Sequence, residues 1–478
     1  MVKACPDAQG TCTTRRPIWR PLWSLALIGL SACGDPASSP LHVTSTAAPG
    51  ATLPVCTPAP EPDTGQHWIS SWRTAPGDAL ITHPITGLTV RQAFAPHRSG
   101  TQLRLRLSNR YASTPLTLDR VHVAREQTPG RAAMVPGTAC ALTFDGASRV
   151  TLGAGQSIVS DPVHYPVRAF ERLGISFYAP RLTPQITRHL GAAEFLYLSL
   201  PGDHAADPGD TAFVQVPDGY ASNFLAIESL EVTAPRSVSV VVAVGDSITD
   251  GSAATTAALN PGGNPMTATD QRYPDHLQRR IDAAGLPLSV ANAGIGGNEL
   301  LSAGWLPQFG RSLLDRLDHD VLAVPGASHV LAMIGTNDLG NPKLGPIPTA
   351  DELIAGLEQL IQRVQAAGLK AIIGTIPPAE GAVIDGLPVI GGWPLGVGIL
   401  HGSASARAGR DAVNSWIRAQ TLSDGIVDFA ACLEDPARPG YLTPEFNSGD
   451  NLHPSPRGYA AMADCVDLNL LAPSEPSP

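Results

Sequence analysis

The sequence predicts a two-part α/β protein. An antiparallel β-sandwich over residues 65–232 precedes a three-layer α/β/α sandwich with a parallel sheet over residues 235–473. Two observations predict this fold class. Short runs of alternating apolar and polar residues recur through the first region, and strand-like runs alternate with helix-like runs through the second. A period of two is typical of strands with one polar face, and strand–helix alternation is typical of parallel sheets.

The first region contains at least five alternating runs, at residues 88–94, 102–108, 116–123, 148–152 and 173–178. Such runs, separated by turns and with few helical stretches, indicate the sandwich. Trp68 and Trp72 are an even number of residues apart, which places both on one face of a strand. We expect that face to belong to the core, with a sugar-stacking surface as the alternative.

The second region begins with a nearly continuous apolar run at 238–244, as expected for a buried parallel strand. Further strands are predicted at 288–290, 329–334, 371–376 and 425–428, with helices at 274–284, 311–318, 350–367, 406–420 and after Pro456. Active sites in such sheets gather at the carboxyl ends of the strands.

The N-terminus is typical of a lipoprotein signal peptide over residues 1–33. Basic residues precede an apolar run at 22–30, and Leu30-Ser31-Ala32-Cys33 resembles a lipobox. Cys33 is then the lipid-modified first residue of the mature chain, and a plain signal peptide is the alternative. The run is too short for a spanning helix, which needs about 20 apolar residues. A Pro/Ala/Thr-rich linker at 34–64 follows, so we expect an exported protein, lipid-anchored at the cell envelope or secreted.

Four cysteines remain in the mature chain if Cys33 is modified: Cys56, Cys140, Cys432 and Cys465. An even number in an oxidising compartment predicts two disulfides. The preferred pairing joins Cys432 to Cys465 around the loop that carries His453, and Cys56 would pair with Cys140. Four free thiols are the alternative. No Cys-x-x-Cys or His-x-x-x-His grouping supports a zinc site, and we expect no cofactor.

The composition limits the kinds of partner that the protein can bind. The 478 residues carry a formal net charge of -10 and 43% hydrophobic residues, with no basic stripe. A sizeable core is therefore possible, and we expect no nucleic-acid partner. The acidic balance concerns solubility and says little about the substrate.

Four short motifs follow one another at 245–251, 292–298, 335–338 and 450–454. Ser247 comes directly after the first parallel strand, and a neutral serine needs a base within hydrogen-bond reach to act as a nucleophile. His453 is the candidate base, and Asp450 can reach back to orient its ring. Gly297 and Asn337 are candidate oxyanion donors together with the Ser247 N–H. Together these groups supply the parts of an acyl-transfer site.

The order Gly-Asp-Ser, Gly, Asn, His resembles the four-block signature of the SGNH (GDSL-type) hydrolases, with Ile248 where that family usually has leucine. The segments 447–454 and 103–109 are similar to secreted two-domain bacterial members. The resemblance implies an ester hydrolase with Ser247 as nucleophile, His453 as general base and Asp450 as its partner. It also implies Gly297 and Asn337 as oxyanion donors. In some members a backbone carbonyl orients the histidine instead of the carboxylate.

The resemblance leaves the substrate open. We expect hydrolysis of short-chain or acetyl esters, on a small molecule or a glycan, with any membrane contact made only through the N-terminal lipid. A carbohydrate acetylesterase whose sandwich domain holds the glycan is the nearest variant. A non-catalytic surface binding lipoprotein is the alternative from another class. The Gly- and Leu-rich segment 381–402 is a candidate for one wall of the site.

Overall fold

The computed structural model describes residues 56–78, 85–216, 223–252, 265–304, 309–341, 346–382 and 400–472, and from Cys56 onward these residues belong to one compact unit. The predicted signal peptide with Cys33 lies outside the described residues, as do most of the linker and of segment 381–402. Within these ranges, no helix combines the length and apolar character that a membrane span requires.

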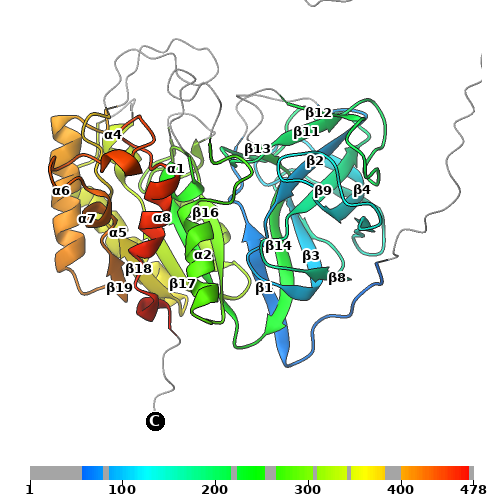
Figure 1. Cartoon of the computed structure of the whole chain (residues 1–478), viewed down its shortest axis with the longest axis horizontal. Coiled ribbons are helices and arrows are strands. Elements are labelled where there is room, and N and C mark those ends of the chain that lie inside the picture. The colour runs from blue at the N-terminus through cyan, green and yellow to red at the C-terminus, as the bar shows by residue number, and fades with distance from the viewer. Residues whose placement is uncertain are drawn as a thin grey trace, which may run out of the picture. The chain divides into compact units, whose positions relative to one another are not determined.

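The N-terminal half of the unit is built from antiparallel sheets (Figure 1). The first sheet has the order β1 (Gln66–Arg73), β14 (Ile227–Pro235), β3 (Gly100–Ser108) and β7 (Ser157–Val159), and β8 (Val163–Val167) also pairs with β3. The second has the order β12 (Phe213–Gln215), β11 (Leu196–Ser199), β2 (Leu88–Phe94), β9 (Leu173–Ala179), β4 (Leu116–Arg125) and β5 (Cys140–Ala141), with β6 (Arg149–Leu152) on β4. A short pair joins β10 (Arg188–Leu190) to β13 (Asn223–Leu225).

Strand β3 shows why these residues form a sandwich. Leu103, Leu105 and Leu107 point into the core and are fully buried. Arg104 and Arg106 alternate with them on the outer face, where both guanidinium groups bond the carboxylate of Glu231 on β14. The alternation read from the sequence therefore marks the inner and outer faces of the sheet, as predicted.

The two tryptophans of β1 do not share a face. A β-bulge between Ser70 and Trp72 shifts the register, so Trp72 stacks on Phe94 in the sandwich core at 3.9 Å between ring centroids. Trp68 is also buried, but it lies under the Arg104 guanidinium and donates to Glu61. The prediction of one shared face was wrong because an extra residue in the strand reverses the alternation. Both rings are nevertheless buried, as expected.

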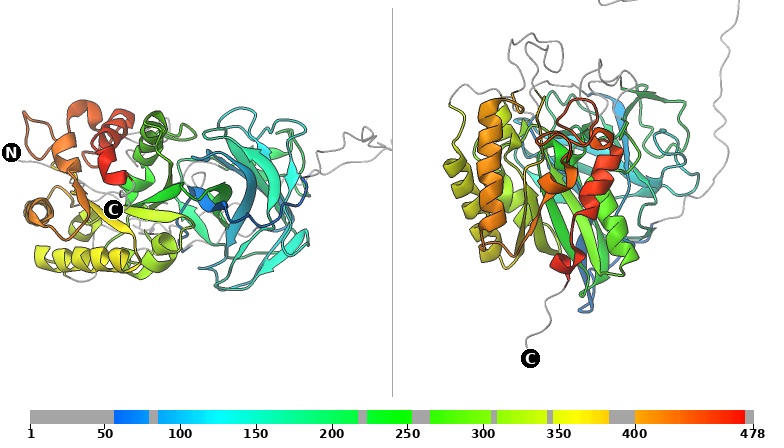
Figure 2. Two further views of the ribbon diagram at one scale, coloured as in Figure 1. Left: turned by 90° about the horizontal axis from the view of Figure 1, so that it is seen from below. Right: turned by 60° about the vertical axis from the view of Figure 1, so that its left-hand side comes forward.

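The C-terminal half contains one parallel sheet with helices on both faces (Figure 2). Its strand order is β16 (Leu288–Gly294), β15 (Ser239–Gly245), β17 (Ala327–Met333), β18 (Lys370–Gly374) and β19 (Gly425–Val427). The helices are α1 (Ser247–Asp250), α2 (Tyr273–Ala283), α3 (Leu313–Leu317), α4 (Thr336–Gly340), α5 (Ala350–Ala366), α6 (Ala404–Ala419), α7 (Phe429–Leu433) and α8 (Pro456–Asp464). The helix expected at 311–318 is shorter than predicted and continues as a π-helical turn over Asp318–Leu322.

Strand β15 contributes to two cores. Val241 and Ala243 pack in one cluster with residues of α2 and α8, whereas Val240, Val242 and Val244 pack in another with residues of α5 and α6. A strand buried on both faces needs apolar residues at every position, which explains the continuous run at 238–244. The three-layer arrangement predicted from the sequence is confirmed.

The antiparallel and parallel halves share a tight junction. Strand β1 lies beside β16, where the Ser289 hydroxyl donates to the Ser70 carbonyl at 3.0 Å. The Ser70 N–H donates in turn to the Pro325 carbonyl at 3.0 Å. His97, just after β2, also crosses the junction and bonds Asp275 of α2. The sandwich therefore packs directly against the parallel half, while the predicted boundaries at 65–232 and 235–473 stay a prediction.

Both predicted disulfides are present. Cys56 joins Cys140 of β5, which ties the start of the described chain to the second sheet of the sandwich. Cys432 of α7 joins Cys465, the C-cap of α8, across a sequence separation of 33. The second bridge encloses the segment that carries His453, as the sequence suggested.

Candidate active site

Ser247 stands at the start of a one-turn helix directly beyond β15. Asp246 caps this helix, because its carboxylate accepts the Ile248 N–H at 2.9 Å. Gly251 ends the helix with a φ of 100°, a left-handed conformation that glycine adopts without strain. The sharp strand–helix turn leaves the Ser247 side chain at the carboxyl edge of the sheet.

His453 and Asp450 come to the same place from a loop 200 residues later. The Ser247 hydroxyl lies 2.9 Å from Nε2 of His453, and Nδ1 of His453 lies 2.7 Å from Oδ2 of Asp450. The other Asp450 oxygen accepts the N–H groups of Leu452 and His453, at 3.0 and 2.8 Å. One carboxylate therefore shapes the loop and orients the ring.

The charges of this pair are tuned by burial and by mutual contact. Burial raises the pKa of Asp450, but the neighbouring His453 and the hydrogen bonds outweigh it and hold that pKa at about 2. Burial lowers the pKa of His453, but the Asp450 carboxylate and its hydrogen bond outweigh burial, and the net pKa is raised. Because the Asp450 carboxylate accepts a hydrogen bond from Nδ1–H, the lone pair of neutral His453 is on Nε2 and faces the Ser247 hydroxyl.

Asp246 adds a second carboxyl group that the motif analysis did not single out. It is fully buried, and burial raises its pKa to about 7, with the nearby Asp338 carboxylate adding to the rise. Its position inside the first motif was visible in the sequence. Its environment depends on residues from three segments, so only the fold reveals it.

Gly297 lies in the loop after β16 with a φ of 76°. A Cβ at this position would collide with the Phe309 ring, so glycine is required both for the backbone conformation and for the close packing. The N–H groups of Gly297 and Ser247 donate to no acceptor among the described residues. Both are therefore available to an oxyanion.

Asn337 lies in the first turn of α4, beyond the end of β17. Its Nδ2 donates one hydrogen to the Asn298 carbonyl at 3.0 Å, and an amide nitrogen has a second hydrogen to offer. Asn341 donates to the Gly297 carbonyl at 3.3 Å, which ties the same helix to the same loop. The Asp338 carboxylate accepts the Leu300 N–H at 2.8 Å. These bonds hold Gly297 and Asn337, the two predicted oxyanion donors, in fixed positions relative to each other.

Arg316 holds together the two strand ends that carry the site, and it was not predicted from the sequence. This fully buried guanidinium donates to the carbonyls of Gly245, the last residue of β15, and Ala293, the last but one of β16, at 3.1 and 2.8 Å. It also bonds Oδ1 of Asn298 at 3.0 Å and pairs with Asp320 at 3.2 Å. The sequence offered one sign of this role: Arg316 is a charged residue on the apolar side of the short helix α3.

The sandwich half also reaches this site. Nε2 of His189, on β10, lies 2.9 Å from Oδ1 of Asp250, the last residue of the helix that begins with Ser247. Nδ1 of the same ring lies 2.8 Å from the Ala75 carbonyl. Sequence reasoning gave the sandwich only a glycan-holding role in one variant of the function and predicted no contact with the Ser247 helix, because pairs this far apart in the chain leave no local pattern.

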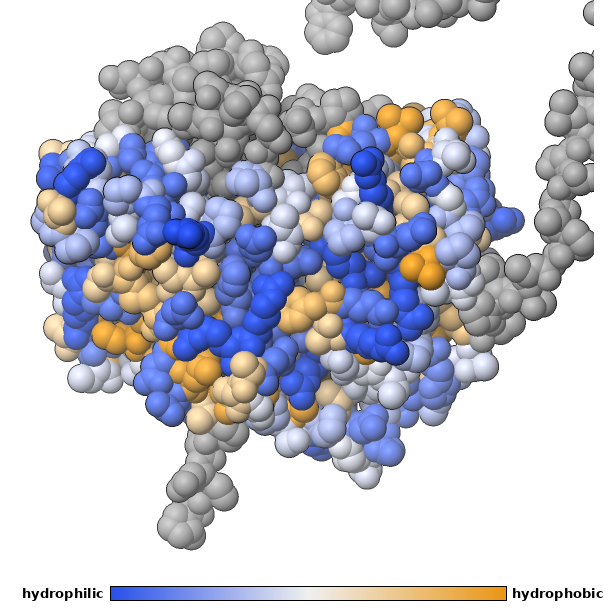
Figure 3. Space-filling model, viewed as in Figure 1, coloured by the Kyte–Doolittle hydropathy of each residue, from blue (hydrophilic) through white to orange (hydrophobic). Residues whose placement is uncertain are grey.

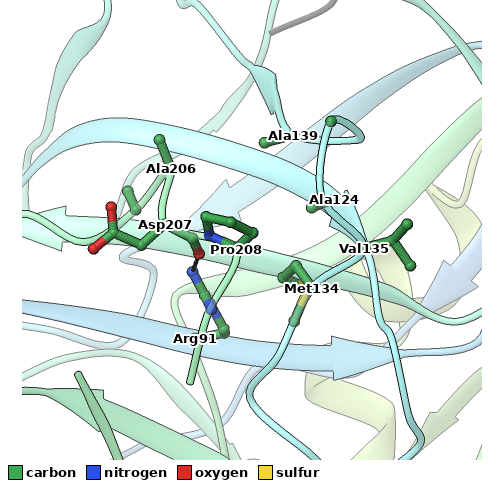
Figure 4. A pocket seen from close by; sticks show the side chains of 10 residues that line it. Arg91, Ala124, Met134, Val135, Ala139, Ala206, Asp207 and Pro208 are labelled. Carbon is green, nitrogen blue, oxygen red and sulfur yellow. Dashed lines mark hydrogen bonds between the residues drawn. The ribbon is translucent and has the colours of Figure 1, made fainter. Parts of the chain in front are cut away.

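The sandwich half contains a small cavity of about 20 Å³ beside Arg91 (Figure 4). The Arg91 guanidinium donates to Ser176 and to backbone carbonyls, among them those of Asp207 at 2.6 Å and Ala132 at 2.7 Å. The cavity has room for about one water, and the Arg91 guanidinium is already hydrogen-bonded to the surrounding loops. This feature is structural.

The described residues contain no group of three or more His, Cys, Asp or Glu side chains that could hold a metal ion. Figure 3 shows polar side chains over most of one face, with apolar side chains in scattered groups. The exposed large apolar residues among those described are Leu182, Leu200, Val214, Ile347, Leu422 and Ile426. The strand-end cluster around Ser247 is therefore the candidate active site.

Three comparisons with known proteins describe what this chain is similar to. Residues 243–461 match the model of the GDSL-like lipase/acylhydrolase family. No curated protein matches the chain. The structure is similar to a carbohydrate acetylesterase from Sinorhizobium meliloti (TM-score 0.34, 14% identity, 47% of this chain and 94% of that one). It is also similar to an acetylxylan esterase from Geobacillus stearothermophilus (TM-score 0.32, 23% identity, 50% of this chain and 97% of that one).

The parallel sheet, the order of the motifs along its strand ends and the family match define the C-terminal half as an SGNH hydrolase domain of the GDSL type. The protein is a carboxylic ester hydrolase. This is the class that the sequence motifs predicted.

Proposed function

We propose that this protein is an exported serine esterase that hydrolyses short-chain or acetyl esters through an acyl-Ser247 intermediate. The observation that carries the proposal is the continuous chain of hydrogen bonds from Ser247 through His453 to Asp450, at 2.9 and 2.7 Å. A hydroxyl, an imidazole and a carboxylate in this order form a nucleophile activated by an oriented base.

In the first half-reaction, Ser247 Oγ attacks the ester carbonyl carbon while its proton moves to Nε2 of His453. The carbonyl oxygen becomes an oxyanion that accepts hydrogen bonds from the N–H groups of Ser247 and Gly297 and from Nδ2 of Asn337. The C–O bond to the alcohol then breaks, and the proton on His453 passes to the departing oxygen. The alcohol leaves, and the acyl group stays on Ser247.

In the second half-reaction, water takes the place of the alcohol. His453 removes a proton from the water as its oxygen attacks the acyl carbon. The same three donors hold the second oxyanion, and the proton returns from His453 to Ser247 Oγ as the carboxylic acid leaves. Asp450 keeps the imidazole ring in one orientation throughout and stabilises its charged form.

The narrow access to the nucleophile supports a small acyl group. Ser247 is 8% exposed and His453 is 6% exposed. Phe309 packs directly against Gly297, on the side of the oxyanion donors. A long acyl chain would need an apolar channel beside these groups, whereas an acetyl group needs little room.

Export is supported by the two disulfides, because such bonds persist mainly in oxidising compartments. The apolar run before Cys33 supports a lipid anchor as the means by which the exported protein is held at the envelope. The substrate is then an ester met outside the cytoplasm, either a small molecule or an acetylated glycan held in part by the sandwich half.

The test is hydrolysis of p-nitrophenyl esters from acetate to palmitate by the wild-type protein, Ser247→Ala and the matched control Ser289→Ala. Ser289 is a buried serine on β16 that bonds the Ser70 carbonyl. We expect a steep preference for acetate, an inactive Ser247→Ala and an active control. Full activity in Ser247→Ala would overturn the nucleophile, and equal activity on palmitate would overturn the short acyl group.

A fluorophosphonate probe separates the esterase from the alternative of a surface binding lipoprotein. The probe should label the wild-type protein once, and Ser247→Ala should stay unlabelled. Absence of labelling in a folded wild-type protein that also hydrolyses none of the esters would favour the binding protein.

A further inference from the structure

The segment 400–402 docks on the helix that carries Asn337. The Leu400 N–H donates to the Gly340 carbonyl of α4 at 3.0 Å, and the Gly402 N–H donates to the Ala382 carbonyl at 3.0 Å. His401 lies between these two anchors and is buried. The sequence offered 381–402 only as a wall of the site, and the described end of that segment has a more specific place.

Nε2 of His401 lies 3.1 Å from Oδ1 of Asn337. Because Nδ2 of Asn337 faces the Asn298 carbonyl, which only accepts, the atom toward His401 must be the amide oxygen. An amide oxygen also only accepts, so Nε2 of His401 must carry a proton and donate it. The network thus determines both the amide orientation and the imidazole tautomer.

The His401 ring is fixed by packing. A Cβ on Gly340 would collide with the ring, so the imidazole rests directly on the backbone of α4. Burial lowers the pKa of His401 to about 3, and the nearby His453 adds to that effect. The ring therefore stays neutral wherever the proposed esterase works. Its Nδ1 has no hydrogen-bond partner among the described residues, as expected for the nitrogen without a proton.

We propose that His401 is a positioning residue for the oxyanion hole: it donates Nε2–H to Oδ1 of Asn337 and so aims the remaining Nδ2–H of Asn337 at the reacting carbonyl oxygen. The proposal rests on the proposed function, since it assigns Asn337 to the oxyanion. His401 acts through Asn337, and among the described residues it has no hydrogen bond to Ser247.

The amide needs two restraints because it rotates about one bond. The Asn298 carbonyl holds one Nδ2 hydrogen, and His401 holds the oxygen on the other side. Without the second restraint the amide plane can swing, and the donor is misdirected for part of the time. A single oxyanion donor is worth about 10²–10³ in kcat, so imperfect aim should cost a fraction of that, about tenfold.

The test compares His401→Leu, which removes the donor, with His401→Gln, whose side-chain N–H₂ can take the place of Nε2–H. On p-nitrophenyl acetate we expect His401→Leu to lower kcat by about tenfold with little change in KM, because the oxyanion forms only after binding. His401→Gln should recover most of the loss. The matched control is His329→Leu on β17, another buried histidine with one unpartnered ring nitrogen.

A double-mutant cycle decides whether the effect passes through Asn337. In the background of Asn337→Ala, which should itself lose about 10²–10³ in kcat, adding His401→Leu should lower kcat by less than about twofold. Additive losses would mean that His401 acts elsewhere and would overturn the proposal. Equal kcat in wild type and His401→Leu would overturn it as well.

Failure of this inference is distinguishable from failure of the proposed function. If Ser247→Ala retains activity, the esterase mechanism itself is wrong. If Ser247→Ala is inactive and His401→Leu turns over like wild type, only the positioning role is lost. Should His401→Leu not fold, His401→Phe, which keeps a planar ring but lacks the donor, takes its place in the two Asn337 backgrounds: a kcat loss that disappears with Asn337→Ala supports the proposal, and an additive loss or an unchanged kcat refutes it.

Discussion

Two kinds of His–Asp pair occur in this molecule, one at the strand ends and one at the junction of its halves. His453 binds Asp450 at 2.7 Å, and His97 binds Asp275 at 2.9 Å. In each histidine the second ring nitrogen, which does not face the aspartate, has a different partner. Nε2 of His453 faces the hydroxyl of Ser247, whereas Nδ1 of His97 lies 2.7 Å from the Val290 carbonyl.

A hydroxyl can donate, but a carbonyl can only accept. His453 therefore keeps a lone pair that can take a proton from the hydroxyl, while the His97 nitrogen that faces the Val290 carbonyl can only donate. The same holds for His189, which bridges the Ala75 carbonyl and Asp250. The comparison teaches that the third partner decides whether a buried His–Asp pair performs proton transfer or joins two segments of the fold.

The sharpest way to break this comparison is to remove each imidazole. For His453→Ala we expect kcat on p-nitrophenyl acetate to fall by about 10⁴–10⁶, because the base is lost. For His97→Ala we expect kcat to stay within about tenfold of wild type, with unfolding made easier by about 3–5 kcal/mol, because Asp275 is left buried beside a missing partner. Steady-state kinetics and denaturant unfolding measure both. A folded His97→Ala as inactive as His453→Ala would end the distinction.

The second largest difference in activity is expected between variants of the two carboxylates, Asp450 and Asp275. Asp450→Asn should lower kcat by about 10²–10⁴. It should also move the acid limb of the kcat/KM profile to lower pH. Only neutral His453 accepts the serine proton, and since its pKa is raised, wild-type activity falls with decreasing pH from a point above the usual histidine range. Without the Asp450 carboxylate the pKa of His453 is no longer raised, so the activity should persist to lower pH.

The matched variant is Asp275→Asn, whose carboxylate lies at the junction. Its pH profile should keep the wild-type acid limb, since Asp275 contacts His97 and Arg272 and not His453. An unshifted limb in Asp450→Asn would mean that Asp450 does not act on the base.

A smaller effect is expected for His189, which touches the helix of Ser247 only through Asp250. His189→Leu should lower kcat by about tenfold, because the helix end loses its anchor to the sandwich and the nucleophile is less well placed. His189→Gln should stay near wild type, since its amide can still donate to Asp250. Identical kinetics in all three proteins would show that the sandwich half does not influence the site.

The smallest expected change in activity comes from the disulfide that encloses the His453 loop. Cys432→Ser combined with Cys465→Ser should lower the free energy of unfolding by about 2–4 kcal/mol, while hydrogen bonds to Asp450 still hold the ring. Thermal melts with and without reductant measure this. The control is Cys56→Ser with Cys140→Ser in the sandwich, which should affect stability alone. A larger loss of kcat in the Cys56/Cys140 variant than in the Cys432/Cys465 variant would contradict the prediction that only the second disulfide restrains the His453 loop.

Local patterns were enough for most of the architecture. The alternating runs predicted the sandwich strands, and the apolar run at 238–244 predicted the first parallel strand. The helix expected at 350–367 is α5 (Ala350–Ala366), where Thr349 and Glu352 form a capping box. Such features depend on neighbours within a few residues, so one sequence contains them. The bulge in β1 depends on pairing with β14, and the prediction for Trp68 failed there.

Periodicity and motif spacing are properties of the chain, so the fold class, the order of the motifs and the residue types of the site can be predicted from the sequence. Three contacts became visible only in the folded molecule: His189 reaches Asp250, Arg316 holds the ends of two strands, and His401 faces Asn337. These contacts join residues 61 to 71 positions apart. Their partners are chosen by the packing of layers and by the need of buried polar groups for hydrogen bonds, which no local pattern encodes.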